Sequence, residues 1–330
     1  MKKEMQVKRK HHFVWSHYLK NWQQEKKISY INSKGNISSD SVKGLAREID
    51  FYKISYMTDE EYKLIKLYLR PFIPFIQEYV LDILDDIRSK LNLAKHLDSS
   101  NPEEHHSLTT IYEHNVLEDF HSQFEKNTIE ILEYLSMGDI SILNDSQNLI
   151  TFYSFLGHQC ARTKAFKEKS LNAIKSEPLQ NYLSLNVDED MVNSLITVLD
   201  KHWWFMSMVL GTSLGYNIFI ADKPFFLIEN KTALPFLTSD QPFTNMYAKS
   251  TSLKTPPKKL DLYFPISPNY AFMVNDTAKY DFFKSTLTID DVHNFNFAVS
   301  SKAYSFLFSN SESSLSFYRK AFINRKAMPK

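Results

Sequence analysis

The chain has 330 residues, of which 43% are hydrophobic and 14% aromatic, and its net charge is +1. This length allows a large core in one domain or two, and the near-zero charge excludes a global attraction to nucleic acid or to an anionic membrane. The six glycines form neither a P-loop nor a dinucleotide-binding fingerprint, and the single Cys160 excludes internal disulfides and a cysteine-based zinc site.

The N-terminus is basic over residues 2–10 but lacks the apolar segment of a signal peptide. The most hydrophobic stretch, residues 203–214, is too short to span a bilayer. We therefore expect a cytoplasmic protein with no membrane partner. Any contact with nucleic acid would need a local patch, and the basic N-terminus is the candidate.

Residues 8–22 combine basic, histidine and aromatic side chains. This pattern predicts a turn or short helix with one aromatic face. Residues 27–38 alternate in polarity around Gly35, which predicts a β-hairpin with a positive φ at the glycine. Thr58 precedes three acidic residues, and the pattern predicts a helix start with Thr58 or Asp59 as N-cap. That helix should run over residues 59–97, with a break at its two prolines.

The chain then becomes mainly helical before it turns to strands. Three more helices are predicted, the first closed by a glycine, over residues 103–137, 145–170 and 188–216. The last is bulky and apolar all round, which is typical of a central buried helix. Strands are predicted over residues 217–221, 225–229, 235–239, 260–265 and 270–274. Thr288 should cap a helix over residues 290–308, and residues 249–259 predict a flap-like loop.

These elements predict an α+β fold in which a helical bundle, residues 59–216, packs on one face of a mainly antiparallel sheet. The sheet should be built from the N-terminal hairpin and the C-terminal third of the chain. We expect a single domain over residues 1–330, with the bundle as a subdomain inserted between the sheet-forming segments 1–58 and 217–330.

The stretch most indicative of a site is residues 234–242, where an apolar run ends in Thr238, Ser239 and Asp240 before Pro242. It predicts a short strand that brings hydroxyls and a carboxylate to a strand end. Ser239 and Asp240 are candidates for nucleophile and base, and Asp240 for a metal ligand. The structural alternative is a turn in which the Asp accepts backbone N–H groups. Ser239 lacks the flanking glycines of a nucleophile elbow, which argues against a serine hydrolase.

Candidate partners for this stretch lie far away in the sequence. His12 has an intrinsic pKa suited to a general base, or else packs on an aromatic neighbour and fixes the N-terminus. Gln159 and Arg162 share a helix face. Arg162 can hold a phosphate or carboxylate there, or can join the bundle to the sheet by pairing with a buried carboxylate such as Asp240.

One face of the helix predicted over residues 103–137 carries a regularly spaced set of titratable side chains: His114, Glu118, His121 and Glu125. Glu118 and His121 have the spacing of a metal half-site in a helical bundle, and residues 103–106 repeat the same letters. The alternative, which the pattern favours, is a solvated helix face. Glu125 is in addition a candidate for an acid–base group or a single metal ligand.

Short motifs in a particular order carry a family resemblance. The first is a basic run that leads to His12, with Trp15 where a proline is usual. The second is Gln159 followed by Arg162 and Thr163, again without the usual following proline.

A Glu on the helix that precedes Gln159 is matched by Glu125. The motifs that follow are residues 238–242, residues 264–268 and Asn296. In this order the motifs resemble a bacterial family catalogued as domain of unknown function 4238. The resemblance supports the candidate residues and implies no activity.

We expect a hydrolase that acts on a phosphodiester, with nucleic acid as substrate. The catalytic candidates are His12, Glu125 and Asp240. The substrate-binding candidates are Gln159, Arg162, Thr163 and Ser239. Glu125 and Asp240 would orient His12 or bind a divalent metal, Mg²⁺ or Mn²⁺. Such a protein would fit a bacterial defence or toxin effector.

Two alternatives remain open at this point. The first is a non-catalytic interaction or sensor protein, in which the same residues form a buried network between bundle and sheet. The second is a protein that binds an anion or small ligand through Arg162. Exposure separates these hypotheses: an open pocket around His12, Arg162 and Asp240 favours an enzyme or a ligand site, whereas burial with all groups paired favours a structural network.

Overall fold

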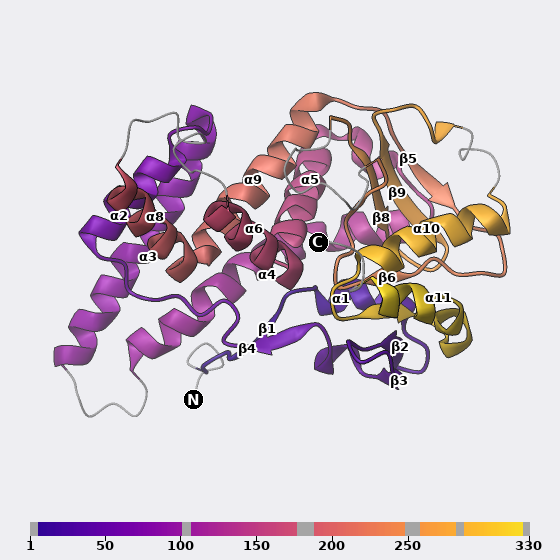
Figure 1. Ribbon diagram of the computed structural model, residues 1–330, viewed down its shortest axis with the longest axis horizontal. Helices are drawn as coiled ribbons and strands as arrows, with labels where there is room; N and C mark the ends of the chain where they lie inside the picture. Colours follow the sequence, from indigo (N-terminus) through magenta and orange to yellow (C-terminus); the bar gives the residue numbers. More distant parts are fainter. Residues whose placement is uncertain (1–5, 101–106, 177–187, 248–257, 282–286, 326–330) are drawn as a thin grey trace.

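The computed structural model describes residues 6–100, 107–176, 188–247, 258–281 and 287–325. Helices form one side of the molecule and most of the strands the other, and α10 and α11 lie beside the strands (Figure 1). Helices together with antiparallel strand pairs make this an α+β fold, as the sequence predicts.

The N-terminal segment is built from short elements. They are β1 (Lys10–His12), α1 (Ser16–Leu19), η2 (Lys20–Trp22), β2 (Ile28–Ile31), β3 (Ile37–Asp40), η3 (Val42–Gly44) and β4 (Arg47–Ile49). The predicted hairpin is confirmed, because β2 pairs antiparallel with β3 and Gly35 has a φ of +83°. β1 pairs with β4 in a separate two-stranded ladder.

The middle of the chain is helical. Its elements are α2 (Asp59–Leu69), α3 (Pro74–Ser100), α4 (Leu108–Ser136), η4 (Ser141–Asn144), α5 (Ser146–Ala161), α6 (Lys164–Ser176), α8 (Glu189–Lys201) and α9 (Trp203–Ala221). Thr58 caps α2 in a reciprocal capping box with Glu61, as its sequence predicts. The break between α2 and α3 is also confirmed, and Gly138 follows α4 with a φ of +88°.

Two predicted helices are each divided. The helix expected over residues 145–170 ends at Ala161, and α6 begins after Arg162 and Thr163. The helix expected over residues 188–216 is interrupted at His202, between α8 and α9. Neither junction contains glycine or proline, so the sequence carries no local signal for either break.

The strand predicted over residues 217–221 is wrong, because α9 continues to Ala221. The helix ends where Asp222 takes a left-handed conformation, two residues before Pro224. By length and composition alone, α9 is the one helix of the described ranges that could cross a membrane, and half of its apolar window is buried inside the fold.

Helices α5 and α9 approach each other closely because glycines face the contact. A Cβ atom on Gly157 would lie 2.2 Å from the carbonyl oxygen of Gly211, and one on Gly215 would lie 2.7 Å from the carbonyl oxygen of Tyr153. Side chains cannot be accommodated at such distances. The contact therefore fixes the position of α5, which carries Gln159 and leads to Arg162.

The C-terminal part contains β5 (Phe225–Glu229), β6 (Thr238–Ser239), β7 (Thr244–Asn245), β8 (Asp261–Pro265), β9 (Tyr270–Asn275), α10 (Ile289–Lys302), β10 (Leu307–Ser309) and α11 (Glu312–Asn324). The predicted pairing of β8 with β9 and the Thr288 cap of α10 are confirmed. The helix predicted to reach residue 308 stops at Lys302, and α11 has no counterpart among the predicted elements. Most of the expected flap, residues 249–259, lies outside the described residues.

The strands form two four-stranded sheets in the described residues, whereas one sheet was expected. The order is β3-β2-β10-β6 in the first and β5-β9-β8-β7 in the second, and all pairs are antiparallel. The N-terminal hairpin therefore does join strands from the C-terminal part, but only β6 and β10.

The second sheet is covered on both faces. Along β8 and β9, Leu262, Phe264 and Phe272 belong to the core shared with the helical bundle, whereas the alternating Tyr263 and Met273 belong to the core shared with α10 and α11. The bundle thus packs on one face, as predicted, and the C-terminal helices pack on the other. All the candidate residues belong to the bundle, the N-terminal segment or the β6 end.

Candidate functional site

Arg162 lies at the junction between α5 and α6, where its side chain turns into the protein. It is 3% exposed, and its Nη2 donates to Oε1 of Glu125 on α4 and to Oε1 of Gln159, each at 2.7 Å. Burial alone would lower the pKa of Arg162, but nearby Glu125, Tyr52 and Glu118 raise it overall. Arg162 is therefore a fixed positive charge in the interior.

Gln159 ties this charge to the N-terminal segment. Its Oε1 also accepts from the backbone N–H of Trp15 at 3.3 Å, and its Nε2 donates to the carbonyl oxygen of Phe13 at 3.0 Å. The hydroxyl of Tyr52 donates to the carbonyl oxygen of Arg162 at 3.1 Å. The backbone around His12 is thereby held against the end of α5.

Helix α4 presents carboxyl groups to the same region. The pKa of Glu118 is raised to about 7 and that of Glu125 is raised as well, in both cases mainly by burial. His114 and His121 are each 5% exposed. The expectation that this face of the helix is solvated is therefore wrong, because the N-terminal segment and α5 cover it.

Several buried nitrogen atoms here have no hydrogen-bond partner in the described residues. They are Nε2 of His12, Nδ1 of His121, Nδ1 of His158 and Nε of Arg162. The charge of Arg162 contributes to a lowered pKa at all three histidines, where burial is the largest cause. We define the Arg162 cluster as His12, Tyr52, Glu118, His121, Glu125, His158, Gln159 and Arg162. The cluster is mostly buried but not fully paired, so it is neither the open pocket nor the fully paired network expected from the sequence.

Asp240 does not take part in this cluster. Its carboxylate is fully buried and accepts the backbone N–H groups of Tyr304 at 2.8 Å and Ser305 at 2.6 Å. Burial raises its pKa to about 6. The interaction is the backbone-capping alternative, here with the loop before β10. Arg162 pairs with Glu125, not with Asp240, so the proposed link from Arg162 to the sheet is wrong.

Ser239 and Gln241, in the same motif over residues 238–242, also form structural hydrogen bonds. The Oγ of Ser239 accepts the backbone N–H of Gln241 at 3.0 Å. The Oγ1 of Thr163 donates to Oε1 of Gln241 at 3.0 Å. Thr163 and Ser239 thus lie where α6 meets the β6 turn, while Arg162, adjacent to Thr163, faces the other way into the bundle.

The metal-site hypotheses find no support in the geometry of the described chain. No group of three or more His, Cys, Asp or Glu side chains in those residues is arranged to hold a metal ion. The carboxylates of Glu125 and Asp240 bond to different partners, Arg162 and backbone amides. The second Glu-x-x-His, residues 103–106, lies outside the described residues.

Four of the candidate residues, His12, Glu125, Gln159 and Arg162, meet in the Arg162 cluster, but their expected meeting point, Asp240, lies outside it. The sequence favoured a solvent-facing position for Glu118 and His121, although their spacing with Glu125 was the signal that joined them. No local sequence pattern distinguishes Tyr52 or His158 from ordinary core residues.

A comparison with known families covers these positions. A family model described as "Protein of unknown function (DUF4238)" matches residues 10–313, which include the whole Arg162 cluster and the β6 turn. No curated protein and no solved structure shows a significant match. Since the family model covers most of the chain, the protein belongs to the DUF4238 family.

Proposed function

We propose that the protein is a phosphodiester hydrolase that acts on nucleic acid and that the Arg162 cluster is its catalytic centre. The observation that carries this proposal is the gathering of unpaired buried nitrogens and raised-pKa carboxyl groups around one guanidinium. Interiors selected only for stability pair nearly all such groups. Perturbed titratable groups concentrate at functional sites.

The roles follow from charge and protonation. Arg162 neutralises the non-bridging oxygens of a phosphate. His12 has a lowered pKa and is neutral near pH 7, so it can accept a proton from the attacking water. As the new P–O bond forms, the bond to the leaving oxygen breaks. Glu118, with a pKa of about 7, donates its proton to that oxygen. Glu125 holds Arg162 in place.

The basic residues of the N-terminus would guide the polyanion. Lys8, Arg9 and Lys10 lie on the segment next to the cluster, at its exposed or half-buried edge. A cytoplasmic nuclease of this kind would suit a bacterial defence or toxin effector, and that setting is part of the same proposal. Asp240 has no catalytic role in it.

The test is cleavage of labelled RNA and DNA, single- and double-stranded, with and without Mg²⁺ or Mn²⁺. Glu118→Gln and His12→Gln should each lower the rate by about 100-fold or more, as expected for loss of an acid–base group. Glu130→Gln is the matched control, since Glu130 is exposed on the same helix. The proposal fails if the wild type cleaves nothing under any condition, or if the two cluster variants cleave like the control.

A second candidate is a non-catalytic interaction or sensor protein. The bonds of Gln159 and Tyr52 to backbone atoms favour it, because they join the N-terminal segment to α5. In that case no nucleic acid is cleaved and Glu118→Gln leaves every solution property except stability unchanged. A third candidate, an anion-binding protein, predicts that inorganic phosphate raises the Tm of the wild type but not that of Arg162→Lys.

A further inference from the structure

Most side chains of the Arg162 cluster are buried, and this raises the question of how a substrate reaches them. A small cavity beside Trp204 and a shallow hollow between α2 and α8, which Leu64 and Met191 line, are both formed without any cluster residue. Glu118 is only partly exposed, on the face of α4 that the N-terminal segment crosses.

The N-terminal segment changes character at His11. Residues 6–10 are exposed or half-buried, whereas His11 is fully buried and the following residues 13–15 belong to the core. His11 is held firmly, because its Nδ1 accepts the backbone N–H of Tyr52 at 2.8 Å and its Nε2 therefore donates to the carbonyl oxygen of Lys8 at 2.6 Å. We call residues 6–8 the strap, because Lys10 is paired with Ile49 in the β1–β4 ladder.

Polar contacts with α4 hold the strap down near Glu118. The backbone N–H of Lys8 donates to Oδ1 of Asn115 at 2.8 Å, and Nδ2 of Asn115 donates to the carbonyl oxygen of Gln6 at 2.9 Å. The ammonium group of Lys8 pairs with Asp119. Glu118 lies between these two anchors in sequence, and the charge of Lys8 acts on it.

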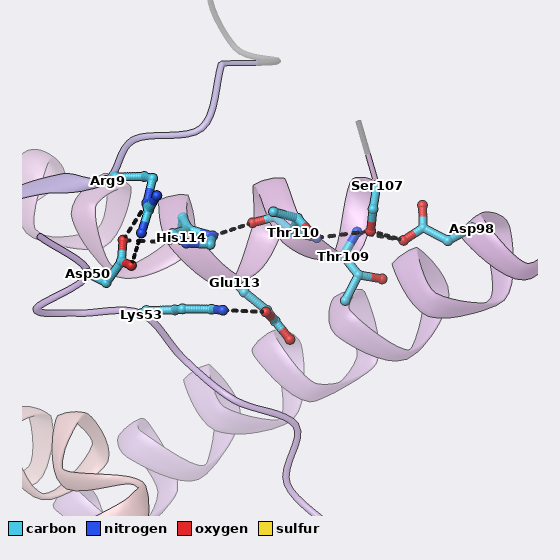
Figure 2. A network of polar contacts seen from close by, with 9 residues as sticks. All are labelled: Arg9, Asp50, Lys53, Asp98, Ser107, Thr109, Thr110, Glu113 and His114. Carbon is cyan, nitrogen blue, oxygen red and sulfur yellow. Dashed lines mark hydrogen bonds and ion pairs between the residues drawn. The ribbon is translucent and has the colours of Figure 1, made fainter. Parts of the chain in front are cut away.

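The backbone after the strap is fixed to the loop after β4, because the N–H of Asp50 donates to the carbonyl oxygen of Arg9 at 2.8 Å. Arg9 forms two hydrogen bonds with the carboxylate of Asp50, which in turn lies 3.5 Å from Nε2 of His114 (Figure 2). The side chain of Arg9 is 60% exposed. Exposed ion pairs are weak and are screened by salt, in contrast to the apolar anchoring of residues 13–15.

We propose that the strap is a gate: residues 6–8 lift from α4, with Arg9 and β1 as the fixed end, and so open the Glu118 side of the Arg162 cluster. The gating role rests on the proposed function, whereas the movement does not. Regions held by few apolar contacts and by exposed hydrogen bonds are those that open locally at low free-energy cost.

The test measures access to position 118 without relying on catalysis. The parent protein is Glu118→Cys in a Cys160→Ser background, so that position 118 carries the only thiol. Adding Asn115→Ala and Lys8→Ala releases the strap and should raise the labelling rate with a maleimide by about tenfold, or about 1.4 kcal/mol of opening free energy. About 1 M NaCl, where the Debye length is about 3 Å, should also raise the rate in the unreleased parent.

The matched control removes one amide and one lysine elsewhere on α4, as Gln123→Ala with Lys126→Ala, both exposed. It should leave the labelling rate unchanged. Equal rates in the released, control and parent proteins would overturn the gate, as would equal acceleration by the control. Thermal unfolding identifies a variant that has lost its fold, and the salt measurement then decides. Faster labelling combined with an inactive wild type would support the movement while refuting the proposed function.

Discussion

The replacement Arg162→Met tests most directly how the interior depends on one charge. Arg162 is 3% exposed, and its partner Glu125 is 15% exposed. Removing the guanidinium leaves the Glu125 carboxylate buried without its counter-charge and removes one donor from Gln159. Breaking a buried pair from one side typically costs about 3–5 kcal/mol, and we expect a loss of that size in the free energy of unfolding.

The double variant Arg162→Met with Glu125→Leu separates the cost of an orphaned charge from that of lost packing. Replacing both partners of a buried pair by apolar groups is often close to neutral, so the double variant should recover most of the loss. Urea unfolding at pH 7 measures each value, with the slope compared among variants to confirm a common unfolding reaction.

A surface pair serves as the control. Lys175 and Asp200 are each close to half exposed, so Lys175→Ala should cost less than about 1 kcal/mol. The reasoning is refuted if Arg162→Met costs no more than this control, or if the double variant is as unstable as the single one.

Three further outcomes are expected. Asp240→Ala should lower the free energy of unfolding by about 2–4 kcal/mol, because two buried backbone amides lose their acceptor; a loss below about 1 kcal/mol in urea unfolding contradicts this. Gly157→Ala should cost more than about 3 kcal/mol or prevent folding, since its Cβ would lie 2.2 Å from the Gly211 carbonyl oxygen; wild-type Tm would disprove the close contact. Burial lowers the pKa of His158 from 6.5 to about 3, so the unfolded chain binds the proton more readily. Stability should therefore fall as the pH drops through this range, by up to about 5 kcal/mol, and His158→Gln should flatten that dependence in acid unfolding.

The sequence predicts elements well where local chemistry determines them. Thr58 is followed by acidic residues that complete its capping box, and Gly35 supplies the φ that the hairpin turn requires. Residues 217–221 fail for the opposite reason: their short apolar run looks like a strand, but α9, which contacts α5 at Gly211 and Gly215, continues through them. Local periodicity cannot report such a tertiary contact.

In the candidate site, too, local sequence determines some features and tertiary contacts determine the others. The spacing of Glu118, His121 and Glu125 correctly places them on one helix face, but only the fold shows that the face is covered. Asp240 and Arg162 are both buried polar residues in family-like motifs, and no sequence pattern states which partner each will find. Their separation follows from the junction after α5, where adjacent residues Arg162 and Thr163 face opposite sides.

The long connections of the N-terminal segment have a consequence for synthesis of the protein. The hydroxyl of Tyr18 donates to the carbonyl oxygen of Pro265, 247 residues later, and Nε1 of Trp22 donates to that of Phe236. Strand β2 finds its partner only when β10 has been made. The first aromatic residues of the nascent chain therefore wait, unburied, until most of the polypeptide has left the ribosome. Contacts of such sequence separation slow folding and leave apolar surface open to association with other chains for longer.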